Sequence, residues 1–552
     1  MSQARSHALT NQTPPLADVN LFTTDEALQD AARREGAAPY VEQLARDGAV
    51  VGAASSLEHG RLANRYPPLL QSYSTQGERI DAIEFHPSWH ALMQGIVARG
   101  YHSSPWAHES GGGAHVARAA GYLMQAQVEC GTLCPTTMTY GAIPTLRRDP
   151  ALARSWVPRL LSRAYDPRDV PIEQKLGGLV GMGMTEKQGG SDVRANTTRA
   201  ERTADGSYRI SGHKWFFSAP QCDAHLVLAQ ADGGLSCFFM PRRLPDGARN
   251  AILVQRLKDK LGNRSNASSE VEFAEAWAQL LGEEGRGVPT ILEMGTYTRL
   301  DCLIGTSGMM RQAVVQALHH ARHRKAFGAP LIEQPLMRAV LADLALESEA
   351  ATALSMRLAR AFDSEAASEV TLRRALTSAA KFWVCKRGCE LSVEAMEVLG
   401  GNGYTEELPL ARIVREMPVN SIWEGSGNIM CLDVLRAFAK SPSTCEIVLR
   451  ELSPARALDR NFDAAFERFA ASLAPSALTE GSARRFAQSF VTLMQASVLL
   501  SDAAARALPS ARAVAEGFCA TRLDPSAGWG AVFGAGEAAI DTATILDRAW
   551  RE

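Results

Sequence analysis

The sequence lacks several patterns that would assign it to a simple function class. None of its ten cysteines forms a Cys-x-x-Cys pair, which argues against zinc-ribbon and thioredoxin-like sites. No stretch reaches about 18 uncharged apolar residues and residues 1–15 are polar, so we expect neither a membrane span nor a signal peptide. Scattered cysteines of this kind are mostly small buried groups in a reducing compartment, so the cytoplasm is the expected location.

A strong net charge is also missing. The 58 basic and 60 acidic residues leave a net charge of −2 at pH 7, so no field of the whole molecule draws it to nucleic acid or anionic membranes. Residues 441–552 contain 11 Arg, no Lys and 13 acidic residues, which again leaves a formal charge of −2. Any contact with nucleic acid must therefore come from a local basic cluster.

The chain has 552 residues, 46% of them hydrophobic, which is enough for roughly two to four domains. Residues 1–180 are rich in Ala and Leu at helical spacing, whereas 181–285 contain short alternating or apolar runs that favour strands. Helical spacing returns in 286–440, and 441–552 has the texture of an added helical domain. This segregation of helices and strands predicts an α+β fold, unlike the alternating order of dinucleotide folds.

A Gly-rich segment lies where the texture changes from helical to β. Residues 181–193 read GMGMTEKQGGSDV. Gly189 and Gly190 let the backbone approach a ligand closely, while Thr185 and Ser191 offer hydroxyls and exposed amides to a polar ring or a phosphate. From composition alone, an ordinary Gly-rich turn is the simpler interpretation, by roughly two to one.

Other segments combine aromatic, basic or acidic residues with glycine. Residues 212–218, GHKWFFS, are explained about equally well by an amphipathic strand with core aromatics. Residues 322–331, RHRKAFGAPL, form a basic cluster that is usually a solvated helix face. The runs MEVLGGNGY at 396–404 and MPVNSIWEGSGN at 417–428 are rich in glycine. Their one acid beside a tryptophan, Glu424, would on its own more often lie on the surface.

Taken together and in this order, these segments resemble the signatures of the acyl-CoA dehydrogenase family. The resemblance covers about residues 40–440 and includes 260–264 and 281–287, at the exit from the β segment. It implies an N-terminal helical domain, a middle β-barrel domain and a C-terminal helical bundle, followed here by an extra helical domain. It also implies FAD as the cofactor, an acyl-CoA as the substrate and a homotetramer.

The resemblance assigns roles within each segment. Thr185 would meet the pyrimidine edge of the flavin, and Ser191 would lie near the pyrophosphate. Phe216 would pack beside the isoalloxazine and Ser218 would hydrogen-bond near N5. Arg324 would meet phosphate charge across a subunit contact, because a bidentate guanidinium suits phosphate better than an ammonium. The full set of implied cofactor contacts is Met182, Gly183, Met184, Thr185, Gly190, Ser191, Phe216, Phe217, Ser218, Arg324, Phe327, Trp423, Gly425, Ser426 and Asn428.

For catalysis, the resemblance places Glu424 at the carboxylate that takes the α-proton of the acyl thioester while the β-hydride passes to flavin N5. An α-carbon acid is very weak, so the base must be aimed at the proton and its pKa must be raised by burial. Trp423 beside the carboxylate would supply an apolar wall. The redox step itself belongs to the flavin.

Several details resemble the AidB-like branch of the family, among them the run FHPSWH at 85–90 and the C-terminal extension. His86 and His90 lie four residues apart without a carboxylate motif, so core or capping roles are favoured and no metal site is predicted. Glu397 and Pro335 stand where the common pattern has glutamine, which removes two amide contacts to FAD.

AidB-like proteins are associated with the response to DNA alkylation and with DNA binding through the C-terminal domain. Here folding would have to cluster Arg436 and Lys440 with residues such as Arg484 and Arg485 to make a basic surface for double-stranded DNA; a solvated helical oligomerisation domain is an equal alternative. Three functions remain open. They are an FAD-dependent dehydrogenase of short or branched acyl-CoA, a flavin-carrying DNA-binding protective protein with weak or vestigial activity, and an oxidase that uses dioxygen.

Overall fold

The computed structural model describes residues 9–107, 112–441, 443–474, 476–525, 532–536 and 540–551. The chain divides into two compact units. The helical unit comprises residues 1–54, 303–421 and 430–552, and the barrel unit comprises residues 55–302 and 422–429. The barrel unit thus takes in one short segment from a distant part of the sequence. The predicted division of the chain into four domains stays a prediction. The structure separates two units, and one of them contains both residues 303–421 and residues 430–552.

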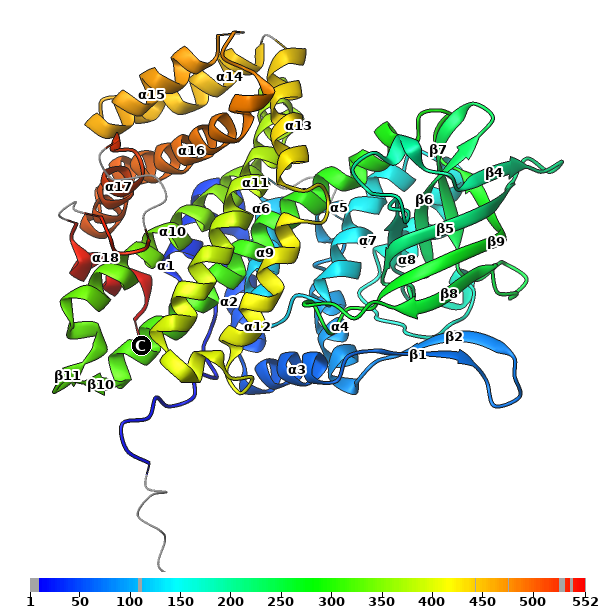
Figure 1. Cartoon of the computed structure of the whole chain (residues 1–552), viewed down its shortest axis with the longest axis horizontal. Helices are drawn as coiled ribbons and strands as arrows, with labels where there is room; N and C mark the ends of the chain where they lie inside the picture. The colour runs from blue at the N-terminus through cyan, green and yellow to red at the C-terminus, as the bar shows by residue number, and fades with distance from the viewer. Residues whose placement is uncertain are drawn as a thin grey trace, which may run out of the picture. The chain divides into compact units, whose positions relative to one another are not determined.

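The barrel unit contains a closed β-sheet (Figure 1). Its seven strands are β3 (Val180–Gly183), β4 (Arg199–Arg202), β5 (Tyr208–Ser218), β6 (Ala224–Ala231), β7 (Gly234–Pro241), β8 (Ile252–Leu257) and β9 (Ser268–Leu280). The ring runs β6, β4, β5, β9 and β7 and closes because β7 pairs with both β9 and β6; β3 pairs with β6, and β8 with β9. The expected α+β fold with a middle β-barrel is confirmed.

Alternating side chains fill the inside of this sheet. Along β5, Tyr208 and Ile210 are buried, whereas Arg209 between them and Ser211 after them are exposed, as the two-residue period of a strand requires. The buried side chains pack with Phe217, Val227, Phe238, Val271 and Phe273 in one core cluster. The runs that sequence analysis assigned to strands therefore form the walls of a packed core.

Helices make up most of the remaining barrel unit. They are α3 (Ala54–Arg65), α4 (Pro87–Arg99), α5 (Ser104–Ala107), α6 (Ala114–Val128), α7 (Leu133–Leu146), α8 (Pro150–Leu160) and the first part of α9 (Gly287–His323). His86 caps α4, because its Nδ1 accepts a hydrogen bond from Ser88 N at 3.2 Å. The predicted capping role of His86 is therefore confirmed. His90 Nδ1 lies 2.9 Å from the hydroxyl of Tyr165.

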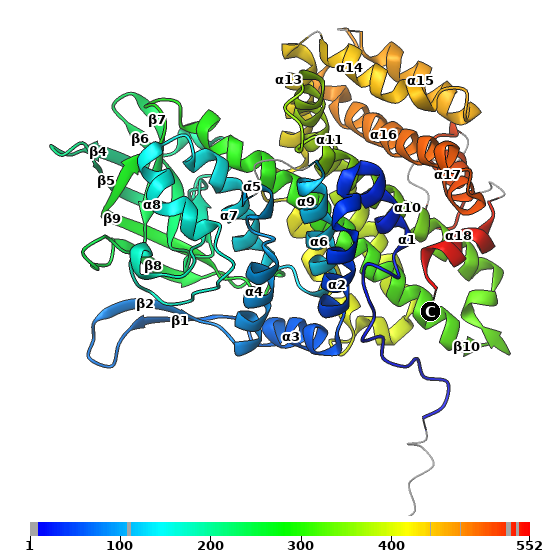
Figure 2. The ribbon, with the colours of Figure 1, turned by 180° about the vertical axis from the view of Figure 1, so that it is seen from behind.

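One β-hairpin departs from the helical prediction for residues 1–180. Strands β1 (Leu69–Tyr73) and β2 (Arg79–Glu84) pair antiparallel and lie beside β8 (Figure 2). Arg79 Nη2 donates to the carbonyl of Val254 at 2.7 Å, and Val254 N donates to Asp81 at 3.2 Å. The hairpin is stabilised by a strand far along the sequence, which is why local spacing did not predict it.

The helical unit is built from long helices around α10. Beside α10 (Pro335–Arg360) they are α1 (Glu26–Ala32), α2 (Val41–Val51), α11 (Ala367–Val398), α12 (Pro409–Glu416), α13 (Gly427–Lys440), α14 (Ser443–Leu452), α15 (Arg460–Ser472), α16 (Ala483–Arg506), α17 (Pro509–Arg522) and α18 (Thr542–Ala549). From Leu341 to Ala359, α10 is buried on nearly every face, because α1, α11, α16 and α18 surround it. Within the described residues, no helix combines the length and apolar character needed to cross a membrane.

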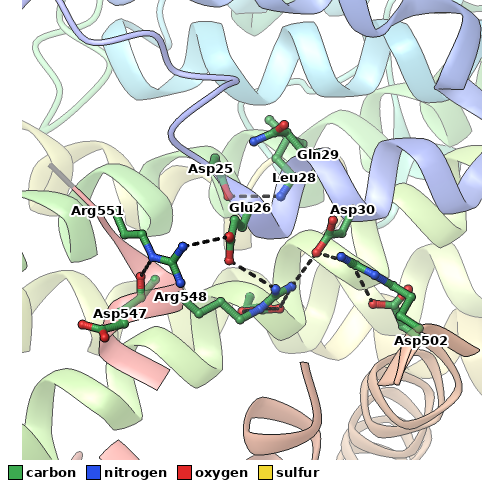
Figure 3. A network of polar contacts seen from close by, with 12 residues as sticks. Asp25, Glu26, Leu28, Gln29, Asp30, Asp502, Asp547, Arg548 and Arg551 are labelled. Atoms are coloured by element: carbon green, nitrogen blue, oxygen red, sulfur yellow. Dashed lines mark hydrogen bonds and ion pairs between the residues drawn. The ribbon is translucent and has the colours of Figure 1, made fainter. Parts of the chain in front are cut away.

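The N-terminal helix α1 and the last helix α18 are held together by buried charges (Figure 3). Arg548 on α18, 2% exposed, pairs with Asp30 at 2.9 Å and Glu349 at 2.8 Å, and with Glu26 at 3.4 Å. Asp30 also pairs with Arg506 of α16. Burial opposes the charge of Arg548, but the surrounding carboxylates outweigh it and hold its pKa above the ordinary value. These contacts fix α18 against α1, since an uncompensated buried charge is costly.

Candidate active site

The Gly-rich segment begins as the buried strand β3 and becomes an exposed turn after Glu186. A Cβ added at Gly190 would lie 2.5 Å from Thr185 Oγ1, so only glycine leaves that hydroxyl in place. A Cβ at Gly189, whose φ is +149°, would meet nothing within 4 Å. Ser191 follows on the exposed part of the turn. The backbone at Gly189 therefore borders open space and Ser191 is exposed, as the close approach of a polar ligand requires.

A buried ion pair, which sequence analysis missed, joins this segment to β5. Lys214 Nζ lies 2.8 Å from Glu186 Oε1, and both side chains are 0% exposed. Burial lowers the pKa of Lys214 to about 8, although Glu186 opposes that shift. Glu186 also accepts hydrogen bonds from the backbone N–H groups of Thr197 and Thr198. In the sequence, this ion pair was indicated only by one charged residue in the Gly-rich segment and one in residues 212–218.

The end of β5 separates its predicted flavin residues by strand alternation. Phe217 is buried and stacks on His225 with 4.0 Å between the ring centroids. Phe216, next to it, points outward and is 53% exposed, with Lys258 Nζ 4.7 Å from its ring centroid. Ser218 is half-buried. Phe216 and Ser218 are thus available to a ligand, whereas the side chain of Phe217 belongs to the core.

The segment 422–429 places Glu424 in the same unit as the Gly-rich segment. Trp423, Met182 and Met184 are half-buried and pack against one common core cluster. Glu424 has a left-handed backbone, φ +59°, and its Oε2 accepts a hydrogen bond from Thr298 Oγ1 at 2.7 Å. The carboxyl group is therefore held by α9 rather than left free on the surface. After it, Gly425 and Ser426 are half-buried and Asn428 is exposed.

Burial raises the pKa of the Cys134 thiol to about 12. The shift is opposed by hydrogen bonds to Asn266 and Ser218 and by the charge of Lys260, and it is increased by the charge of Glu424. No sequence pattern singled out this cysteine, because a lone buried cysteine on a helix is an ordinary core residue.

A cluster of aromatic rings lies next to Thr298. The ring centroid of Tyr297 is 5.3 Å from those of both Trp106 and Tyr140, and His115 packs on Trp106 at 5.0 Å. The guanidinium of Arg118, fully buried, lies 3.8 Å from the Tyr140 ring centroid and is paired with Asp301. The cluster was missed because its members come from α5, α6, α7 and α9, with no shared motif.

Comparison with known proteins decides the family. Residues 11–167 match the model of the adaptive response protein AidB N-terminal domain, residues 181–276 that of the acyl-CoA dehydrogenase middle domain, and residues 285–439 that of the acyl-CoA dehydrogenase C-terminal domain. AidB of Escherichia coli (strain K12) is 56% identical over 466 residues, which cover 84% of this chain and 86% of that protein. The chain belongs to the acyl-CoA dehydrogenase family, in its AidB-like branch.

Solved structures of this family have the same fold. Caenorhabditis elegans ACDH-11, solved in complex with C11-CoA, is similar at a TM-score of 0.86 and 26% identity over 95% of this chain and 94% of that one. An acyl-CoA dehydrogenase from Bacillus anthracis, complexed with FAD, is similar at a TM-score of 0.68 and 16% identity over 91% and 88% of the two chains. The latter likeness concerns the fold alone.

In this AidB-like chain, the turn that carries Arg324 and Phe327 belongs to the helical unit. Phe327, with φ +52°, is 98% exposed between β10 (Lys325–Ala326) and β11 (Ala329–Pro330). The N-terminal segment fixes this turn: Arg324 Nη1 donates to the carbonyl of Asn11 at 2.6 Å. The side-chain amide of Asn11 makes two hydrogen bonds to the backbone of Lys325. Its Nδ2 donates to the Lys325 carbonyl at 2.8 Å, and its Oδ1 accepts from the Lys325 N–H at 2.7 Å.

The two departures from the common family pattern lie on the same unit. Pro335 is exposed in the first turn of α10, where its missing N–H leaves no buried group unsatisfied. Glu397 is exposed near the end of α11. Gly400, with φ +59°, and Gly401 follow it, and a Cβ on either would meet nothing within 4 Å.

The predicted basic residues of the last segments lie on helices that touch. Arg436 and Lys440 are exposed on α13. Phe438 of the same helix packs on Phe486 of α16 at 4.9 Å between ring centroids. Arg484, two residues before Phe486 on α16, is exposed. Folding therefore brings the basic ends of α13 and α16 to one region of the helical unit.

Proposed function

We propose that this chain oxidises a short or branched acyl-CoA, with Glu424 as the base that removes the α-proton. As a member of the acyl-CoA dehydrogenase family, the chain is an FAD-dependent oxidoreductase. The observation that carries the proposal is that Glu424, held by Thr298, lies in the same compact unit as the Gly-rich segment and β5. A lone acid in a surface loop would have none of these neighbours.

The described residues fit an FAD. Gly190 leaves the Thr185 hydroxyl accessible, and Gly189 presents open backbone beside it. Phe216 offers an exposed ring edge or face, and Ser218 a half-buried hydroxyl. We assign these four groups to the flavin and pyrophosphate. The assignment of Arg324 and Phe327 to phosphate and ring contacts across a subunit boundary is part of the same proposal.

The chain's own groups prepare the proton transfer. Glu424 takes the α-proton, so the α-carbon–hydrogen bond breaks and the proton stays on the carboxyl oxygen. When bound, FAD accepts the hydride that leaves the β-carbon. Trp423, the neighbour of Glu424 in the chain, is half-buried and presents apolar surface beside the base, which strengthens its electrostatic interactions by excluding water.

The limit to a short or branched acyl group rests on the family resemblance. ACDH-11, with which this fold was compared, was solved with C11-CoA, so chain length is the property to measure first.

The test is anaerobic bleaching of the bound flavin by a panel of acyl-CoAs, in wild type and in Glu424→Gln. We expect the flavin absorbance to fall with short or branched thioesters in wild type only. Equal bleaching of the variant would show that Glu424 is not the base. The same panel in air, with hydrogen peroxide measured, separates a dehydrogenase from an oxidase, because only an oxidase transfers the electrons directly to dioxygen.

A second candidate function is DNA binding in the response to alkylation. The contact between α13 and α16, which gathers Arg436, Lys440 and Arg484, supports it. We expect duplex binding that weakens steeply with salt, and a shallower slope in Arg436→Ala/Lys440→Ala because fewer phosphates are neutralised. Binding that is unchanged in the double variant would exclude this surface.

We also propose a homotetramer located in the cytoplasm. Large apolar side chains of the helical unit are left in solvent, among them Phe327 at 98%, Leu336 at 85% and Tyr404 at 80% exposed. Exposed apolar side chains of this size are typical of a surface that another copy covers. The ten cysteines are all free thiols, in keeping with a reducing compartment. Sedimentation of the purified protein measures the oligomeric state directly.

A further inference from the structure

The hydroxyl of Thr298 has two polar neighbours but only one proton. Its Oγ1 lies 2.7 Å from Glu424 Oε2 and 3.1 Å from the carbonyl of Gly295. Thr298 is 2% exposed, so solvent does not compete for these contacts. A threonine hydroxyl donates one hydrogen bond and accepts others. The two contacts therefore depend on the protonation of Glu424.

When Glu424 is ionised, the Thr298 hydroxyl donates to the carboxylate. When Glu424 is protonated, its carboxyl O–H donates to Thr298 Oγ1, and the Thr298 proton turns to the carbonyl of Gly295. Both arrangements use the same heavy-atom positions, and each leaves every donor with an acceptor. The site thus needs no side-chain movement when the acid gains or loses its proton.

We infer that Thr298 is a positioning residue that holds Glu424 in one place before and after proton transfer. This rests on the proposed function, in which Glu424 is the base. Proton abstraction needs the carboxyl oxygen close to the α-carbon and correctly aimed, and small misplacements of a reacting group are expensive. A partner that hydrogen-bonds both protonation states keeps that aim before and after the transfer.

Two other threonines of α9 use their hydroxyls differently. Thr296 donates to the carbonyl of Leu292 at 3.0 Å, and Thr290 to that of Arg286 at 2.9 Å, each four residues back. That is the usual contact of a threonine within a helix. Thr298 turns instead toward the carbonyl three residues back and toward Glu424. Thr296 therefore supplies a matched control on the same helix.

Gly295 lies beside Glu424. A Cβ added at Gly295 would be in ordinary van der Waals contact with Glu424 Oε2 at 3.8 Å and with Leu292 at 3.6 Å. The charged or titratable groups that face Glu424 include Arg299, whose Nε donates to the Glu424 carbonyl at 3.0 Å, and the Cys134 thiol. Thr298 contacts the reactive carboxyl itself, whereas Arg299 holds the backbone beside it.

The test compares Thr298→Val, which keeps the shape and removes the hydroxyl, with Thr298→Ser, which keeps the hydroxyl. Thr296→Val is the control for loss of a threonine hydroxyl from α9. Two readouts are taken on the FAD-loaded protein. The first is the rate of anaerobic bleaching by acyl-CoA as a function of pH. The second, without substrate, is the infrared carbonyl band of the protonated carboxyl, assigned by its loss in Glu424→Gln.

We expect Thr298→Val to bleach about 10 to 100 times more slowly and its carboxyl to titrate about one pH unit higher, because a hydrogen bond to the ionised form is lost. Thr298→Ser and Thr296→Val should match wild type in both readouts. An infrared titration and bleaching rate of Thr298→Val equal to wild type would overturn the inference. If Thr298→Val does not fold, the inference is tested with Thr298→Ser. A wild-type bleaching rate and titration in Thr298→Ser support the inference, and a loss of bleaching rate as large as in Glu424→Gln contradicts it. Wild type that no thioester bleaches would instead refute the proposed function.

Discussion

Replacement of Lys214 by methionine tests whether the buried ion pair with Glu186 holds the two candidate flavin segments together. The change removes the ammonium but keeps most of the side-chain volume. Both partners are 0% exposed, so the variant leaves a carboxylate buried without its counter-ion. Breaking such a pair costs about 3 to 5 kcal/mol of unfolding free energy. The double variant Glu186→Gln/Lys214→Met should recover much of that loss, because no buried charge remains.

The assay is urea unfolding followed by protein fluorescence and by release of the flavin. Arg256→Met serves as the control: its ion pair with Glu270 lies on the same sheet, but the Arg256 side chain is 64% exposed, so its loss should hardly change the unfolding midpoint. A Lys214→Met midpoint close to that of Arg256→Met would refute the reasoning. So would a double variant that is less stable than the single one.

The same pair predicts a pH dependence with a definite sign. Burial lowers the pKa of Lys214 to about 8 from an ordinary value of 10.5. Between these values, the unfolded chain binds more protons at Lys214 than the folded chain does, so the stability contributed by this residue rises with pH. Wild type should therefore gain stability relative to Lys214→Met as the pH increases from about 8 to about 10.5.

Three further changes have expected outcomes. Gly190→Ala places a Cβ 2.5 Å from Thr185 Oγ1, so fluorescence titration should show FAD affinity weakened at least about tenfold. An affinity equal to that of wild type would show that Thr185 does not contact the flavin. Asn11→Ala removes two hydrogen bonds to the Arg324 turn and should also weaken FAD binding, without a change in the thermal midpoint larger than that of a neutral surface substitution. Arg548→Met leaves Glu349 of α10 without this counter-ion and Asp30 of α1 with Arg506 as its remaining partner. It should cost about 3 to 5 kcal/mol in unfolding free energy, measured by denaturant titration; a cost below about 1 kcal/mol would contradict the role given to this network.

The parts of the fold that followed from the sequence are those with local signals. The change from helical to alternating texture near residue 181 reflects the two different periods of helices and strands, so the barrel was predictable. The hairpin β1–β2 was not, because Asp81 and Arg79 bind Val254, far along the chain. A short strand pair of that composition is marginal by itself and forms only against its partner.

The candidate site divides in the same way. Glu424 and the Gly-rich segment belong to long motifs, and their resemblance to a known family identified them. Thr298 lies in a segment that reads as an ordinary helix, and Lys214 lies in a motif whose implied roles fall to other residues. Their partners lie 126 and 28 residues away. Residues that act by holding another residue are chosen by packing geometry, and no local spacing records that geometry.

The charge network around Arg548 also determines when helix α1 can complete its ion pairs during synthesis of the chain. Asp30 emerges from the ribosome long before its partner, which is 518 residues later in the chain. Domains generally fold from the N-terminal end as they are made, yet helix α1 must wait for the segment that contains α18 before Glu26 and Asp30 meet Arg548. A nascent chain that stalls after α16 has only Arg506 as a partner for Asp30, so the docking of α1 is completed only once α18 is made.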